Sequence, residues 1–136
     1  MRKLFELMRT LPSDVDCGII SSDVNIKYFT KFSLTDGLLV VTHSDAYLLV
    51  DFRYYEMAKA CITDISVICF EDLKNELENI FKINNCSRVA IESGNVVVRT
   101  FENYKKRFRD VVFIADARFD DIILNLRMIK TDYEIK

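Results

Sequence analysis

The sequence predicts an α/β domain, a three-layer sandwich in which helices cover both faces of a mixed β-sheet. Two patterns indicate this fold: a β-hairpin in the first half of the chain, and a regular alternation of strands and helices after it. Crossover helices join parallel strands, whereas a hairpin joins antiparallel ones, so the sheet is mixed. The size fits one such domain, because the chain has 136 residues, 50% of them hydrophobic, and only three Gly and one Pro.

Each predicted element of the first half follows from local periodicity. Apolar residues at intervals of three and four predict helices, and short β-branched apolar runs predict buried strands. Pro12 closes the first helix, Ser22 caps the second, and Ser44-Asp45 separates the two hairpin strands. The expected order is a helix over 4–11, a strand over 15–21, a helix over 22–29, a polar loop over 31–37, and strands over 38–43 and 46–52.

The second half repeats a strand followed by a helix. Its helices carry apolar residues along one face, and its strands are short apolar runs that end in polar residues. The expected order is a helix over 53–62, a strand over 66–70, a helix over 71–81, a strand over 88–92, a helix over 95–108, a strand over 111–116 and a helix over 119–129.

Composition excludes several classes of function. His43 is the single histidine, it lies at the predicted hairpin turn, and we expect a solvated turn residue rather than a metal ligand. A formal net charge of -2 argues against a general binder of nucleic acid or anionic membrane. No phosphate-binding glycine loop and no nucleophile-elbow motif occurs, and no apolar run has the roughly 20 residues of a membrane span.

The four cysteines do not form a paired framework. Each of them lies inside or beside an apolar run, at Cys17, Cys61, Cys69 and Cys86. Free cysteine in such a setting behaves as a small buried hydrophobe. We therefore expect reduced, buried thiols in a cytoplasmic protein.

Three carboxylates end predicted strands: Asp51, Glu92 and Asp116. In ribonuclease H-like nucleases, acids at strand ends hold two divalent ions, so a nuclease is one hypothesis. The alternative is that these acids cap the following helices, as Asp116 would do for the helix over 119–129. The basic run 105–107 with Arg109 is better explained as a solvated helix end than as a nucleic-acid surface.

Two motifs, in order along the chain, resemble the amino-terminal domain of the creatinase, prolidase and aminopeptidase P family. Those domains show an N-I-x-Y-L-T-G-F-x-x-x-x-G-x-L-L-V pattern and, after a hairpin, a D-x-R-Y-x-x-A motif. Lys31 stands where the first pattern has Gly, and the segment 126–135 is similar to the family's exit toward its second domain. The matching residues are Asn25, Ile26, Tyr28, Thr30, Phe32, Gly37 and Leu39, then Asp51, Arg53, Tyr54 and Ala58.

This resemblance implies a ribonuclease H-like fold of the creatinase N-terminal type, with the domain over 1–127 and the start of a linker over 128–136. Family members are peptidases that cleave beside proline, and their metal ligands all lie in a carboxyl-terminal pita-bread domain. The resemblance therefore implies a non-catalytic domain without a cofactor, from a parent with two divalent ions (Mn, Co or Zn). The implied partners are its own catalytic domain, a second subunit in a homodimer, and short Xaa-Pro peptides, with neither nucleic acid nor membrane.

In the family, a loop of this domain reaches toward the other subunit's active site and limits access to short peptides. The position-matched residues are Phe32, Ser33, Leu34, Thr35 and Asp36. Phe32 would line an apolar wall and Asp36 would meet a peptide amino group; the alternative is ordinary loop packing with Asp36 turned to solvent. We expect a structural role for the second motif, Asp51, Arg53 and Tyr54, with Arg53 pairing either with Asp51 or with a neighbouring element.

Three functional alternatives remain at this point. The parent is an Xaa-Pro dipeptidase, an Xaa-Pro aminopeptidase or a creatinase, which the first domain does not distinguish. A second hypothesis is a binding module, because the same architecture occurs without metal ligands in a histone-chaperone subunit. The third is the nuclease that uses the three strand-end acids.

Overall fold

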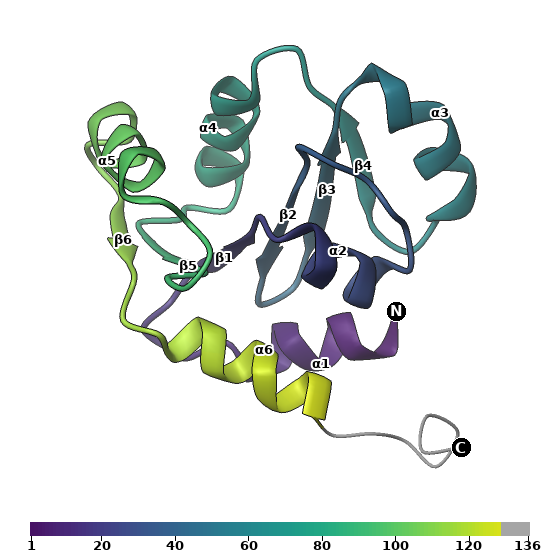
Figure 1. The fold of residues 1–136 in the computed structure, drawn as a ribbon. Coiled ribbons are helices and arrows are strands. Elements are labelled where there is room, and N and C mark those ends of the chain that lie inside the picture. Colours follow the sequence, from purple (N-terminus) through teal and green to yellow (C-terminus); the bar gives the residue numbers. More distant parts are fainter. Residues whose placement is uncertain (129–136) are drawn as a thin grey trace.

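The computed structural model, described over residues 1–128, contains a six-stranded sheet between two layers of helices (Figure 1). This arrangement confirms the predicted three-layer α/β fold. The elements are α1 (Arg2–Thr10), β1 (Cys17–Ile20), α2 (Asp23–Thr30), β2 (Leu38–Thr42), β3 (Ala46–Val50), α3 (Phe52–Cys61), β4 (Ser66–Cys69), α4 (Leu73–Ile83), β5 (Arg88–Ile91), α5 (Val98–Arg107), β6 (Val112–Ile114) and α6 (Arg118–Met128).

The sheet is mixed, as the hairpin and the crossovers predict. Its strand order is β4-β3-β2-β1-β5-β6. β2 runs antiparallel to both of its neighbours, and all the other pairs are parallel. At the hairpin turn the Thr42 N–H donates to the Asp45 carbonyl at 2.8 Å. The carboxyl ends of β1, β3, β4, β5 and β6 therefore share one edge of the sheet.

Both faces of the central strands are buried. On β3, the adjacent side chains of Leu48 and Leu49 are each 0% exposed and belong to different hydrophobic clusters. One cluster packs α1, α2, α3 and α6 against the sheet, and the other packs α4 and α5 against the opposite face. α1 and α6, the first and last helices, lie side by side (Figure 1).

Gly18 allows α6 to approach the sheet closely. A Cβ atom on Gly18 would lie 2.5 Å from Cζ of Phe119, which is 2% exposed. Only a glycine leaves room for this ring against β1.

Several elements differ by one to three residues from the boundaries that periodicity predicts, and hydrogen bonds explain the shift of α5 and β1. α5 begins at Val98 rather than at Asn95, because the N–H groups of Asn95 and Val96 form a turn onto the Glu92 carbonyl. β1 begins at Cys17, since the N–H of Val15 bonds the Pro12 carbonyl in the preceding turn. The domain boundary expected at residue 127 falls in the last turn of α6. Of the linker expected over 128–136, residue 128 ends α6, and residues 129–136 lie outside the described residues.

The expectation that all four thiols are buried is wrong for two of them. Cys17 and Cys86 are buried, but Cys61 and Cys69 are exposed. Cys61 is the last residue of α3. Cys69 ends β4, an edge strand whose four residues are all at least partly accessible because one side has no neighbouring strand. Apolar neighbours in sequence therefore do not bury a residue at the end of a helix or on an edge strand.

Candidate functional site

The loop between α2 and β2 is fixed at both ends by backbone geometry. Lys31 ends α2 in the left-handed region, with φ of 63°, and its N–H donates to the Lys27 carbonyl at 2.8 Å. Asp36 is also left-handed, with φ of 60°. A Cβ on Gly37 would lie 2.8 Å from the Leu49 carbonyl oxygen, so the position just before β2 has no room for a side chain.

The loop presents a polar surface and turns its apolar side chains inward. Phe32 and Leu34 are 9% and 5% exposed and belong to the hydrophobic core. Ser33, Thr35 and Asp36 are exposed. The inward position of Phe32 matches the loop-packing alternative that the sequence left open, while the role of residues 32–36 toward a peptide stays a prediction.

The second motif starts α3. The Asp51 side chain caps the helix by accepting from the Arg53 N–H at 2.9 Å. The same carboxylate accepts from Arg53 Nη2 at 2.6 Å and from Nε at 3.1 Å. The Arg53 guanidinium lowers the pKa of Asp51 through this hydrogen bond, and Asp51 in turn raises the pKa of Arg53.

The two motifs contact each other. Arg53 Nη2 lies 3.6 Å from Asp36 Oδ2, and the Thr35 Oγ1 and Tyr54 hydroxyl oxygen are hydrogen-bonded at 3.1 Å. The rings of Phe32 and Tyr54 meet edge to face with centroids 6.4 Å apart. The sequence suggested that Arg53 pairs either with Asp51 or with a neighbouring element. In the structure it pairs with both, since the neighbouring element is the loop that contains Asp36.

The three strand-end acids are not gathered into one centre. Asp51 pairs with Arg53, and Asp116 accepts from Arg118 Nε at 3.0 Å and from the Arg118 N–H at 3.2 Å. Asp116 therefore caps the start of α6, as the alternative interpretation predicted. Over residues 1–128, no group of three His, Cys, Asp or Glu side chains lies close enough to hold a metal ion.

Glu92 has a structural role that the sequence did not reveal. Its side chain is 2% exposed, and Oε1 accepts from the N–H groups of Ser21 and Ser22 at 2.6 and 2.9 Å. Oε2 accepts from Asn25 Nδ2 at 2.6 Å, and Arg127 Nη1 donates to Asn25 Oδ1 at 2.8 Å. The Glu92 bonds join the end of β5 to the start of α2, 67 to 71 residues away in sequence, and the Arg127 bond joins α2 to α6, 102 residues away. The sequence shows an acidic residue at the end of a buried strand, but it does not show which groups that residue binds.

A family model for the creatinase/prolidase N-terminal domain matches residues 1–129. The chain belongs to this family. It is 33% identical over 125 residues to an Xaa-Pro dipeptidase of Pyrococcus furiosus, a match that covers 91% of this chain and 34% of that protein. The chain therefore spans about a third of the length of this relative.

Solved structures agree with the fold of this creatinase/prolidase N-terminal domain. Prolidase from Pyrococcus furiosus superposes with a TM-score of 0.76 at 32% identity, over 98% of this chain and 39% of that one. The N-terminal domain of the cytoplasmic peptidase PepQ from Mycobacterium tuberculosis H37Rv gives a TM-score of 0.76 at 21% identity. That match covers 89% of this chain and 98% of the solved chain, so the same fold has been solved as a separate domain.

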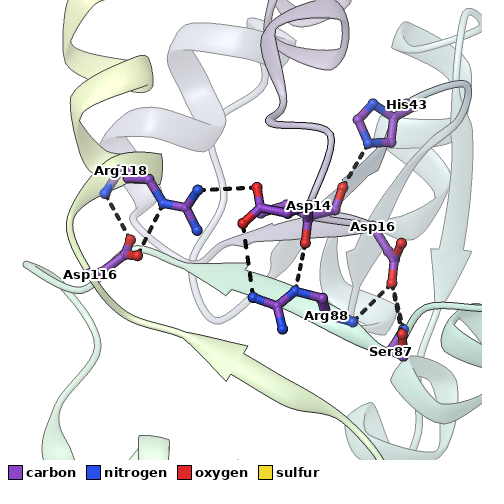
Figure 2. Close-up of polar contacts among 8 residues, drawn as sticks. Asp14, Asp16, His43, Ser87, Arg88, Asp116 and Arg118 are labelled. Carbon is purple, nitrogen blue, oxygen red and sulfur yellow. Dashed lines mark hydrogen bonds and ion pairs between the residues drawn. The ribbon is translucent and has the colours of Figure 1, made fainter.

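Charged residues of this creatinase/prolidase N-terminal domain also link the segments that precede β1 and β5 (Figure 2). Asp14 contacts both Arg118, at 3.1 Å, and Arg88, at 3.9 Å. Asp16 accepts from the N–H groups of Ser87 and Arg88 at 2.8 and 2.9 Å. Partial burial acts to raise the pKa of Asp16, but these hydrogen bonds outweigh it and lower the pKa.

His43 is exposed at the hairpin turn, as predicted. One ring nitrogen, Nε2, lies 2.7 Å from the Val15 carbonyl oxygen, so the residue also ties the hairpin to the segment before β1. The bond from His43 to this carbonyl is drawn in Figure 2.

The basic run at the end of α5 is exposed, as expected for a solvated helix end. Arg107 binds across to α4, where its Nη2 contacts Glu78 Oε2 at 2.8 Å and Asn75 Oδ1 at 3.0 Å. In the described part of the domain, no helix is long and apolar enough to cross a membrane.

Proposed function

We propose that this chain is the non-catalytic N-terminal domain of a metal-dependent Xaa-Pro peptidase, either a dipeptidase or an aminopeptidase P. The observation that carries the proposal is the family match over residues 1–129 together with the coverage of 34% of an Xaa-Pro dipeptidase. The remaining two thirds of that relative are long enough to form a second, larger domain. Peptide hydrolysis then belongs to that second domain, where the family resemblance puts two divalent ions, Mn, Co or Zn.

The proposed role of this domain is to restrict the active site to short proline-containing peptides in a cytoplasmic homodimer. The exposed polar residues Ser33, Thr35 and Asp36 support this role, because they can hydrogen-bond the polar backbone or the amino group of a peptide. Phe52 and Met57 of α3, the helix that contacts the loop, are 82% and 67% exposed. Exposed apolar side chains on this helix suit contact with a second subunit.

The test compares the full-length protein, which under this proposal also carries the catalytic domain, with the chain 1–136 alone. Each is assayed for release of proline from Ala-Pro and Leu-Pro with Mn, Co or Zn, and again after chelation. We expect turnover by the full-length protein, loss of that turnover after chelation, and none at any metal concentration by the chain 1–136. Turnover by a clean preparation of 1–136, or an inactive full-length protein with all three metals, would overturn the proposal.

A series of longer Xaa-Pro peptides then distinguishes the parent activities. A dipeptidase cleaves the dipeptides alone, whereas an aminopeptidase P also removes the first residue from longer peptides. Hydrolysis of creatine in place of peptides identifies a creatinase. Histone binding by a full-length protein that lacks hydrolysis supports the binding module instead, and magnesium-dependent cleavage of nucleic acid that is lost on mutation of Asp51, Glu92 or Asp116 supports the nuclease.

A further inference from the structure

We propose that Arg53 and Tyr54 are positioning residues that hold loop 32–36 in one conformation and thereby set which peptides reach the active site. The inference rests on the proposed function of the loop. It assigns the second family motif a task beyond starting α3: the motif anchors residues 33–36, the variable positions inside the first motif.

Asp51 fixes the orientation of the Arg53 side chain. Two carboxylate oxygens of Asp51 accept from Nε and Nη2 of Arg53, which fixes the guanidinium in a forked, bidentate geometry. A free arginine loses side-chain entropy when it binds, but this one is already ordered before it meets Asp36. The 3.6 Å contact with Asp36 is therefore made by a preorganised cation, although the Asp36 side chain is 84% exposed.

Tyr54 anchors the neighbouring part of the loop through two different contacts. Its hydroxyl group bonds Thr35 Oγ1 at 3.1 Å, and its ring packs edge to face on Phe32. The ring contact joins the anchor to the hydrophobic core, because Phe32 is a core residue. Among residues 1–128, the side-chain polar contacts of Thr35 and Asp36 both go to α3.

The contacts with Arg53 and Tyr54 determine the conformation of the exposed part of the loop. The Lys31 end is held by the last turn of α2. The other end continues directly into β2 at Leu38, and Leu34 and Leu49 leave no room for a side chain at Gly37. Residues 33–36 lie between these fixed ends, and Ser33, Thr35 and Asp36 project to solvent. Removing both α3 contacts leaves this stretch with the buried Leu34 as its link to the core.

The first experiment measures loop order in the chain 1–136 by ¹⁵N relaxation. The variants are Arg53→Gln, Tyr54→Phe and the double variant. The matched controls are Arg107→Gln, which removes an exposed ion pair between α5 and Glu78 of α4, and Tyr55→Phe, which removes a hydroxyl that accepts from Lys59 within α3. We expect order parameters of residues 33–36 to fall from about 0.85 to below about 0.6 in the double variant, with no change in the controls.

The second experiment uses the full-length protein and the same variants. We expect KM for an Xaa-Pro dipeptide to rise about 3- to 10-fold with kcat unchanged, because a loosened loop must be ordered again when peptide binds. The preference for short over longer proline-containing peptides falls in the same variants. Arg53→Lys keeps the charge but lacks the fork that contacts both carboxylates, so its KM lies between that of the wild type and that of Arg53→Gln.

The two readouts separate this inference from the proposed function. Unchanged order parameters in the double variant overturn the anchor, whatever the activity of the full-length protein. A looser loop with unchanged KM and peptide preference overturns the functional consequence of the anchor. A full-length protein without peptidase activity refutes the proposed function alone, since the relaxation data still decide whether Arg53 and Tyr54 hold the loop.

Discussion

At the scale of single residues, the residue that ends α2 distinguishes this chain from the pattern of its family. Lys31 occupies the position where the family pattern has glycine, and it nevertheless adopts the left-handed conformation that glycine accepts without strain. Its ammonium group lies 5.4 Å from the centroid of the Tyr28 ring, a cation–π contact that offsets part of this strain.

The replacement Lys31→Gly is expected to stabilise the domain by about 0.5–1 kcal/mol, because removal of the strain exceeds the lost cation–π contact. Lys27→Gly in the same helix is the control, since glycine inside a helix costs about 1 kcal/mol. Urea denaturation of the two variants measures the effect. Destabilisation by Lys31→Gly similar to that by Lys27→Gly would show that the left-handed conformation carries no strain here.

At the scale of the elements, polar groups placed at helix and strand ends join segments that are far apart in sequence. Glu92 binds β5 to the start of α2, and Asp16 binds the segment before β1 to the start of β5. The neighbouring parallel strands β1 and β5 are thus held at both ends by carboxylates that accept from backbone N–H groups.

Replacing Glu92 with Gln is expected to lower the free energy of unfolding by about 1–3 kcal/mol. Both oxygens of Glu92 accept hydrogen bonds, so in either orientation the glutamine NH₂ group faces a donor in a buried site. Glu102→Gln on the exposed surface of α5 is the control, expected to stay within about 0.5 kcal/mol. Equal denaturation midpoints for the two variants would contradict the role given to Glu92.

The Asp16 contacts predict a pH dependence of stability. The ordinary pKa of the carboxyl group is 3.8, and hydrogen bonds from Ser87 and Arg88 lower it in the folded state despite partial burial. The unfolded chain therefore binds the proton more readily, so the stabilisation is present above pH 3.8 and is lost as the pH falls through the folded pKa. Asp16→Asn is expected to be less stable than the wild type at pH 7, and the difference narrows below pH 3.8. Urea denaturation at pH 7, 4 and 3 measures it, and a constant difference would exclude the linkage.

At the scale of the whole molecule, burial of the sheet on both faces sets stability. Leu48→Ala and Leu49→Ala remove adjacent side chains that are both 0% exposed and point to opposite faces. Each variant is expected to lose about 2–5 kcal/mol. Val67→Ala on the edge strand β4 is the control and loses less, because Val67 is half-buried. If only one of the two leucine variants lost little free energy of unfolding, the face to which that leucine points would not be covered by helices.

The order of strands and helices was predictable because it depends on local periodicity. Each segment carries its own pattern of apolar residues, and Ser22 and Asp51 mark helix starts by side chains that accept from nearby N–H groups. The exposed positions of Cys61 and Cys69 were not predictable in this way. The exposure of Cys69 depends on which strand forms the sheet edge, and that of Cys61 on how the end of α3 packs, and both depend on contacts between distant segments.

The sequence by itself determined the three-layer α/β class, the hairpin and the family, because these follow from periodicity, turn residues and motif spacing along the chain. The tertiary structure alone decided that Arg53 reaches Asp36, that Phe32 turns to the core, and that Glu92 is surrounded by donors. The physical reason is that a side chain's partners are set by which distant segments the sheet brings together. Each of those contacts joins residues at least 17 positions apart or places a loop residue in the shared core, and no local pattern encodes such a pairing.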